Sequence, residues 1–345
     1  MLSVLLYWML AFQFPEVAPE THGMERVHEA VLQESWFSGT VLIARESKIL
    51  FHQAYGWADL EKKVPNSVKT AFGIASVSKQ FAAAAILMLQ EKGILTLDDT
   101  LDRHFSDVPA DKAKITLHQI LSHTSGLPSA YAADGLTQAD QAFKAIMDLT
   151  LANPPGQNFK YSNDGYVLAA LLVEKVTQKP YDSFLKDTFF LPGTMSGTYC
   201  WGEPDLSDPS IAAQLVQPPD APFLRPNYGF RGATGLYSTT SDLFAWFQAL
   251  LNHTVLASES VNALWAEHTA FSRGKVGYGW FSEQTKGGHA TLWTRGVEDF
   301  GTSASLTHFP KEKWTVIILS NSAYQDRLPP PAHRLNEILE PVLIQ

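Results

Sequence analysis

The chain has only one cysteine, Cys200, among its 345 residues. A single cysteine excludes an intrachain disulfide and any metal site built from several cysteine ligands. Because Cys200 lies between Tyr199 and Trp201, we interpret it as a buried structural thiol. The histidines show no H-E-x-x-H or H-x-H spacing, so we expect no histidine-based metal site either.

Charged residues are also sparse. Asp, Glu, Lys and Arg together make up 18% of the chain, and the formal net charge is −9. The low charge content excludes a disordered or coiled-coil chain. The negative balance, without a dense Lys/Arg cluster, argues against a nucleic-acid partner. With 45% hydrophobic residues, the chain can bury a large core as one composite domain or as two.

Long hydrophobic runs are absent except at the N-terminus. Residues 2–14 are apolar but too few to span a bilayer comfortably, so we expect no stable membrane span. They lack the basic residues that precede a signal-peptide core, since the first arginine is Arg26. We interpret residues 1–21 as a possible signal or N-terminal extension, and a short anchor or packed segment stays open. The protein is then secreted or periplasmic through a weak signal, or otherwise cytoplasmic.

Strand patterns occur at both ends of the chain, with helical patterns and long loops between them. The predicted strands are 39–44, 49–55, 235–238, 278–283, 291–294, 302–308 and 314–320. The predicted helices are 22–36, one from Ser76 to near Gly93, 116–122, 138–149, 165–176, 242–251 and 332–343.

This order predicts an α+β fold. An antiparallel β-sheet built from both chain termini would be flanked by the terminal helices, with a mainly helical region inserted. Residues 22–75 and 231–345 would form the sheet domain and residues 76–230 the helical one. We expect a catalytic site at the seam between the two regions.

Ser76 and Lys79 stand three positions apart, just ahead of an alanine-rich apolar run at 81–89. Residues i and i+3 share one helix face, so the hydroxyl and the amine would share a pocket near the helix N-terminus. A serine nucleophile needs a base within reach and positive charge where negative charge develops. Alone, the pattern also fits a capping serine and a solvated lysine.

Two later segments carry further candidate groups. Tyr161-Ser162-Asn163 offers a phenol for proton transfer and an amide for hydrogen bonding, or is an ordinary helix start. Trp293-Thr294-Arg295-Gly296 lies on a predicted strand whose edge can offer a backbone N–H to a developing oxyanion. The aromatic candidates for an apolar pocket, each also explained by core packing, are Tyr131, Phe223, Tyr228, Phe230 and Trp293.

In this chain order, the three segments resemble the serine β-lactamase and penicillin-binding-protein superfamily. That superfamily combines S-x-x-K, a Y-x-N or S-D-N element and a K-T-G-type strand. Residues 115–128 (I-T-L-H-Q-I-L-S-H-T-S-G-L-P) and 235–243 (G-L-Y-S-T-T-S-D-L) look like family segments too. We expect His123, in the first of these, to be structural and bonded within its loop. The resemblance covers about residues 25–340 and is to the class C β-lactamase-like branch, which includes serine esterases and D-aminopeptidases.

The resemblance implies a role for each candidate. Ser76 would be the acylated nucleophile and Lys79 its proton acceptor. Tyr161 would assist deprotonation and protonate the leaving group, and Asn163 would orient Lys79 and bind the substrate. The backbone N–H groups of Ser76 and Gly296 would form the oxyanion hole. Such acyl transfer needs no cofactor, but the pKa of the lysine must be lowered by desolvation or a close partner.

The third segment departs from the family pattern. Trp293-Thr294-Arg295 stands where β-lactamases have Lys-Thr-Gly. Tryptophan here resembles the family esterases, which lack the cation that pairs with a β-lactam or peptide carboxylate. Because side chains alternate along a strand, Arg295 shares a face with Trp293 unless a bulge sends it to solvent. We expect both to face the cleft, where Arg295 would narrow the acyl pocket or anchor a carboxylate.

Together these features predict a serine hydrolase that forms an acyl-enzyme at Ser76, a carboxylesterase acting on short or medium acyl esters. The alternative on the same scaffold is a β-lactamase or a D-aminopeptidase/DD-peptidase. A further alternative is a non-catalytic relative that binds a ligand because Arg295 blocks the cleft. The expected partner is a small-molecule ester or amide substrate, and the sequence makes no prediction of oligomeric state.

Overall fold

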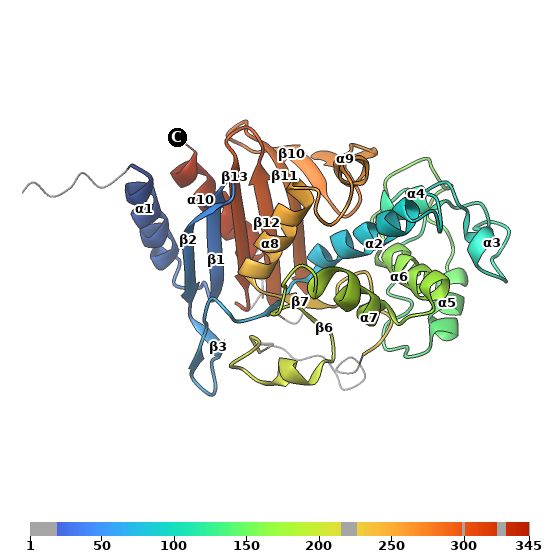
Figure 1. The fold of residues 1–345 in the computed structure, drawn as a ribbon, viewed down its shortest axis with the longest axis horizontal. Coiled ribbons are helices and arrows are strands. Elements are labelled where there is room, and N and C mark those ends of the chain that lie inside the picture. The colour runs from blue at the N-terminus through green and yellow to red at the C-terminus, as the bar shows by residue number, and fades with distance from the viewer. Residues whose placement is uncertain (1–18, 215–225, 299–300, 323–328, 345) are drawn as a thin grey trace, which may run out of the picture.

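A computed structural model describes residues 19–214, 226–298, 301–322 and 329–344. An eight-stranded sheet organises this part of the chain, in the order β2-β1-β13-β12-β11-β10-β9-β8, with every neighbouring pair antiparallel (Figure 1). Its strands are β1 (Gly39–Arg45), β2 (Lys48–Tyr55), β8 (Thr269–Phe271), β9 (Gly274–Val276), β10 (Phe281–Gln284), β11 (Ala290–Glu298), β12 (Thr302–Phe309) and β13 (Trp314–Ser320). Next to the edge strand β2, β1 from one end of the chain pairs with β13 from the other. This confirms the predicted α+β fold with a sheet built from both chain ends.

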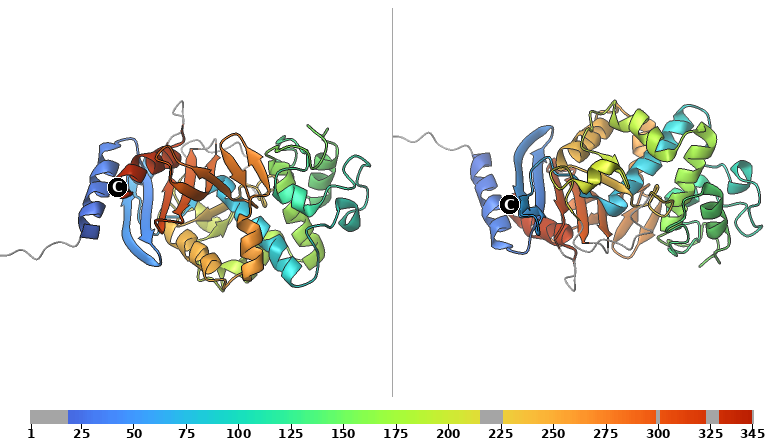
Figure 2. Two further views of the ribbon diagram at one scale, coloured as in Figure 1. Left: turned by 90° about the horizontal axis from the view of Figure 1, so that it is seen from above. Right: turned by 90° about the horizontal axis from the view of Figure 1, so that it is seen from below.

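The sheet is buried on both faces because its central strands carry apolar side chains at successive positions. In β1, Val41 and Ile43 belong to a core shared with helices α1 (Pro19–Gln33) and α10 (Pro331–Leu343). Leu42 and Ala44 belong to the main core on the opposite face. Figure 2 shows α1 and α10 side by side, and α1 packs against β2 while α10 packs against β12 and β13. The terminal helices therefore cover the sheet, as predicted.

The helices between the two groups of sheet strands pack beside the main face of the sheet (Figure 1). Three of these helices begin at a residue whose side chain caps the helix N-terminus. Thr116 and Gln119 form a capping box at α4, Ser162 caps α6, and Thr239 caps α8. The helices of this part are α2 (Lys79–Glu91), α3 (Leu101–His104), α4 (Leu117–Leu121), α5 (Ala139–Met147), α6 (Asn163–Thr177), α7 (Tyr181–Leu185), the π-helical turn η2 (Lys186–Phe190) and the 3-10 turn η3 (Pro204–Ser207). The division into domains at residues 75 and 231 stays a prediction.

Several elements differ from the predicted ones. Ser76 lies not in α2 but in the preceding 3-10 turn η1 (Ala75–Ser78), in which residues i and i+3 still lie above one another. The predicted strand at 235–238 is β7 (Leu236–Ser238), but it pairs with β5 (Phe72–Gly73) and β6 (Tyr199–Cys200) outside the main sheet. Unpredicted elements are the helical segments α3, α7, η2, η3 and α9 (Ser258–Trp265), and the strands β3 (Trp57–Asp59), β4 (Val64–Pro65), β5, β6, β8 and β9. Helix α8 spans Thr240–Leu251.

Candidate active site

Lys79 is the first residue of α2 and is only 1% exposed. Its Nζ lies 3.0 Å from Ser76 Oγ, 2.6 Å from Asn163 Oδ1 and 2.8 Å from the Ala233 carbonyl oxygen. Burial lowers the pKa of Lys79 to about 7, against a smaller opposite effect of the Glu298 carboxylate. A lysine with this pKa is about half deprotonated at neutral pH and can accept a proton.

The contacts of Lys79 suit a neutral amine. Asn163 Oδ1 and the Ala233 carbonyl are acceptors only, so they use two N–H groups of the amine. The third contact of Nζ is with Ser76 Oγ. When the amine is neutral, its lone pair points at this oxygen. The serine hydroxyl can therefore donate its proton directly to Lys79.

Tyr161 approaches the same hydroxyl from the loop that leads into α6. Its phenol OH donates to Ser76 Oγ at 2.7 Å. Burial raises the pKa of Tyr161 above its ordinary value, so the phenol keeps its proton at neutral pH. Tyr161 is thus placed as a proton donor beside Ser76, whereas Lys79 is placed as the acceptor.

The stretch 115–128 holds the Tyr161 loop in position. The ring of His123 stacks on Tyr161 at 4.4 Å, and its Nδ1 accepts the Ser162 N–H at 3.1 Å. Burial, together with the charge of Lys79, lowers the pKa of His123 well below its usual value, so it is neutral. The Ser162 hydroxyl also donates to the Pro128 carbonyl at 2.8 Å. His123 was expected to bond within its own loop; it bonds instead to the loop that carries Tyr161.

Strand β11 passes directly beside the nucleophile. A Cβ atom on Gly296 would lie 2.4 Å from the Ile74 carbonyl oxygen and 2.7 Å from the Ser76 nitrogen, so no other residue fits without backbone movement. Ala75, just before the nucleophile, has φ +49°, a strained value for a residue with a side chain. Strand β10 pairs with β11 only as far as Trp293. The next residues of β11 therefore present an edge that carries no described strand partner and faces Ser76.

A cavity of about 460 Å³ opens at Ser76. Its described lining residues are Ser76, Tyr131, Asp134, Tyr161, Asn163, Gly229, Phe230, Thr234, Val297 and Glu298. Tyr131 and Phe230 were among the aromatic candidates, while Tyr228 instead donates to Glu174 at 2.7 Å and Phe223 lies outside the described residues. Sequence reasoning missed the two carboxylates, Asp134 and Glu298. Glu298 could have been found by counting two positions beyond Gly296, but nothing local marks Asp134.

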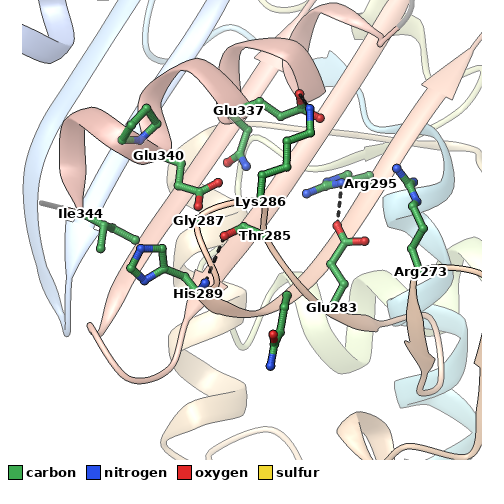
Figure 3. Close-up of a pocket in the computed structure, with 13 residues that line it drawn as sticks. Arg273, Glu283, Thr285, Lys286, Gly287, His289, Arg295, Glu337, Glu340 and Ile344 are labelled. Atoms are coloured by element: carbon green, nitrogen blue, oxygen red, sulfur yellow. Dashed lines mark hydrogen bonds and ion pairs between the residues drawn. The ribbon is translucent and has the colours of Figure 1, made fainter.

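The prediction that Trp293 and Arg295 face the cleft is not supported, because neither lines this cavity. They do share one face of β11, since the Arg295 guanidinium lies 4.4 Å from the Trp293 ring. That face turns toward α10. Arg295 pairs there with Glu283 at 3.2 Å and lines a separate cavity of about 710 Å³ between the β10–β11 hairpin and α10 (Figure 3). By alternation along the strand, Thr294, Gly296 and Glu298 share the opposite face of β11. The β11 residues that line the cavity at Ser76 are Val297 and Glu298.

The cavity at Ser76 has a negative lining. Asp134 and Glu298 contribute carboxylates, and none of its described lining residues is Lys, Arg or His. Lys79, beneath Ser76, is the nearby amine, and its lowered pKa limits its charge. The described residues also hold no cluster of three or more His, Cys, Asp or Glu side chains suited to a metal ion. Within the described ranges, no helix has the length and apolar character needed to cross a bilayer.

The chain is similar in sequence to known proteins. The chain is 29% identical over 329 residues to Penicillin-binding protein 4* of Bacillus subtilis (strain 168), covering 86% of this chain and 71% of that protein. It is 26% identical over 314 residues to Protein flp of Staphylococcus aureus (strain N315), of which it spans only 62%.

Solved structures share the fold. The D-amino acid amidase of Ochrobactrum anthropi SV3 superposes with a TM-score of 0.79 at 21% identity, over 94% of this chain and 98% of that one. A penicillin-binding protein of Bacillus halodurans gives 0.75 at 23% identity, over 92% and 98%. The Beta-lactamase family model matches residues 24–339. Since that match spans most of the sequence, the chain belongs to the Beta-lactamase family, in the serine hydrolase superfamily that also includes penicillin-binding proteins.

Proposed function

We propose that the protein is a carboxylesterase that forms an acyl-enzyme at Ser76. The observation that carries the proposal is the pair of contacts on Ser76 Oγ. Lys79 Nζ lies 3.0 Å away on one side, and the Tyr161 hydroxyl lies 2.7 Å away on another. A base with a pKa of about 7 and a protonated phenol thus meet at one hydroxyl inside a cavity.

Each step of acyl transfer can then be assigned to a residue. Ser76 Oγ attacks the substrate carbonyl carbon and passes its proton to Lys79 Nζ. The oxyanion receives backbone N–H groups from Ser76 and from the free edge of β11 at Gly296. Tyr161 donates a proton to the departing alkoxide and is reprotonated by the Lys79 ammonium, which holds the proton taken from Ser76; an ester between Ser76 and the acyl group remains. Water, deprotonated by the same pair, releases the acid.

Esters are favoured over β-lactams because of charge. A β-lactam or a peptide C-terminus carries a carboxylate that needs a cation beside the nucleophile. The β11 residues that line the cavity are Val297 and Glu298, and neither is basic. The cavity adds a second carboxylate at Asp134. These groups would repel an anionic substrate and tolerate a neutral or cationic one.

The test compares ester and β-lactam turnover on one preparation. We expect p-nitrophenyl acetate and butyrate to be hydrolysed, nitrocefin to be hydrolysed far more slowly, and Ser76→Ala to lose both activities. Ser241→Ala, at an exposed serine in the first turn of α8, is the matched control and should behave as wild type. Nitrocefin turnover comparable to ester turnover would contradict the ester assignment. Undiminished ester turnover by Ser76→Ala would show that Ser76 is not the nucleophile.

A further inference from the structure

A second cavity, of about 710 Å³, lies between the β10–β11 hairpin and helix α10 (Figure 3). Its described lining residues include none of those that line the cavity at Ser76. Two of its polar side chains are buried, since Asn336 of α10 is 4% exposed and the side chain of Arg295 is 13% exposed. A concave site with a few fixed polar groups is the usual form of a small-ligand site, and acyl transfer at Ser76 uses none of these residues.

The protein itself satisfies these two buried side chains poorly. Arg295 has five N–H donors, but it donates one hydrogen bond, from Nη1 to Glu283 at 3.2 Å, and its Nε has no partner among the described residues. The side chain of Asn336 makes no hydrogen bond within the described part of the chain, although its Oδ1 is fully buried. Buried polar groups are normally paired, so this lining is built for a polar ligand rather than for core packing.

One end of the cavity has an excess of positive charge. Arg273, in the turn between β8 and β9, is close enough to Arg295 for their charges to repel. Burial lowers the pKa of Arg295, and Arg273 adds to this effect while Glu283 opposes it. Glu283 is the carboxylate that pairs with Arg295, and no described carboxylate forms an ion pair with Arg273. Two guanidinium groups therefore share one carboxylate, and this end suits a carboxylate of the ligand.

The other end of the cavity is acidic. Glu340 of α10 reaches the tip of the β10–β11 hairpin, because a Cβ atom on Gly287 would lie 3.0 Å from Glu340 Oε1 and 3.5 Å from His289 Nε2. The other ring nitrogen of His289 is occupied, since Nδ1 lies 3.0 Å from Glu312. Glu340 forms no ion pair with a described residue, so its carboxylate suits an ammonium group of the ligand.

The charges of the cavity balance as a whole. Apart from His289, the described lining has three cationic and three carboxylate side chains, which are Arg273, Lys286, Arg295, Glu283, Glu337 and Glu340. Two ion pairs form, one of 3.8 Å between Lys286 and Glu337 and one between Arg295 and Glu283. The charges left without an ion pair are Arg273 and Glu340. Since these have opposite signs, a ligand with one charge of each sign fits the cavity better than a simple anion or cation.

The spacing of the two ends limits the size of the ligand. Figure 3 shows Arg273 and Arg295 on one side of the cavity and Glu340 with His289 on the other. Along the hairpin, the cationic end lies at Glu283 and the acidic end lies four residues later at Gly287. At about 3.3 Å per residue, the ends are at most about 13 Å apart. Hydrogen bonds of about 3 Å at each end leave about 7 Å, the length of about two extended residues.

We propose that this cavity is a second binding site, which takes a dipeptide with both ends free. Arg273 and Arg295 bind its carboxylate, and Glu340 binds its ammonium group. The site is separate from Ser76 and does not depend on the proposed acyl-enzyme.

The experiment titrates L-alanyl-L-alanine into Ser76→Ala, which lacks the nucleophile, by isothermal titration calorimetry at neutral pH. Three related probes each change one feature. N-acetyl-alanyl-alanine has no ammonium group, alanyl-alanine amide has no carboxylate, and free alanine holds its two charges too close together. We expect a Kd of about 1 mM for the dipeptide, as its size suggests, and affinities at least about fivefold weaker for the three other probes.

Arg273→Gln and Glu340→Gln, each added to Ser76→Ala, should weaken dipeptide binding by about three- to tenfold. Glu340→Gln should also bring the affinities of the dipeptide and its N-acetyl form together, and Arg273→Gln those of the dipeptide and its amide. These ratios compare two probes on one sample, so a loss of folded protein cancels from them. Lys144→Gln and Asp140→Asn remove the same charges from exposed positions of α5 and should bind all probes as the parent does.

Three results would overturn the inference. One is the lack of any dipeptide binding up to about 10 mM. Another is equal affinity for the dipeptide and its N-acetyl form, which would mean that the ammonium group is not recognised. The third is dipeptide binding that neither cavity variant weakens, because the peptide would then bind elsewhere, as in the cavity at Ser76. None of these results bears on ester turnover, so a failure here is distinct from a failure of the proposed function.

Discussion

Acylation by this protein should depend on pH through Lys79. Burial lowers the pKa of Lys79 from 10.5 to about 7, because the charged ammonium is the form that desolvation disfavours. The base is then present above about pH 7 and is lost as the pH falls below it. Between pH 5 and pH 7 the neutral fraction rises from about one in a hundred to about one half, so the acylation rate should rise about 50-fold.

The measurement is the burst rate with p-nitrophenyl acetate across this pH range and up to pH 9. The rate should level off above the midpoint, whereas a lysine with an ordinary pKa would give a rate still rising tenfold per unit at pH 9. Glu298→Gln removes a charge that raises the Lys79 pKa and should move the midpoint to lower pH.

Two results would refute this reasoning. One is a burst rate that is independent of pH between 5 and 9. The other is a Lys79→Ala variant that retains both the burst and the same pH midpoint, because the titrating group would then be another residue. Lys79→Arg sharpens the comparison, since arginine keeps its charge throughout this range and should abolish the burst.

Three further changes have separate expected outcomes. Tyr161→Phe removes the proton donor on Ser76 Oγ and should lower kcat by about 10²–10⁴ with little change in melting temperature; an unchanged kcat would exclude that role. Gly296→Ala places a Cβ atom 2.4 Å from a backbone oxygen and should lower activity at least tenfold. Gly23→Ala, which has open space around it, should keep wild-type activity. Equal activities of the two variants would contradict the close approach of β11. Arg295→Met should leave substrate preference unchanged. It should lower the free energy of unfolding by about 1–3 kcal/mol in urea titration, because the 11% exposed Glu283 loses its cation. An altered substrate preference would indicate that Arg295 faces the cleft.

Short spacings and chain order were enough to predict much of the site. Ser76 and Lys79 are neighbours along one turn, so their contact follows from local geometry. Tyr161 and Asn163 lie about 85 positions further on, and the structure brings both to the same pocket. The sheet was predictable for a similar reason, because the strands of both termini have strong apolar patterns.

The details of β11 were not predictable from the sequence. Its existence was predicted, and so was the shared face of Trp293 and Arg295, but alternation along a strand does not say which of the two faces turns to the cleft. What decides the face is the approach of β11 to the backbone of Ile74 and Ser76, which only Gly296 permits. That contact joins segments about 220 residues apart and leaves no local pattern.

Asp134 was missed for a different reason. It lies in a loop without a regular period, and its place in the cavity depends on three hydrogen bonds to Asp164 and on the close approach of Gly229. The short elements α9, β8 and β9 escaped prediction because eight or fewer residues carry too little periodicity.

The central claim is that Ser76 becomes covalently acylated. The most direct measurement is intact-mass analysis followed by peptide mapping after reaction with a fluorophosphonate probe, on wild type and Ser76→Ala. We predict a single adduct on the peptide that contains Ser76 and none in the variant. An adduct on another serine, or no adduct on folded wild-type protein, would contradict the account.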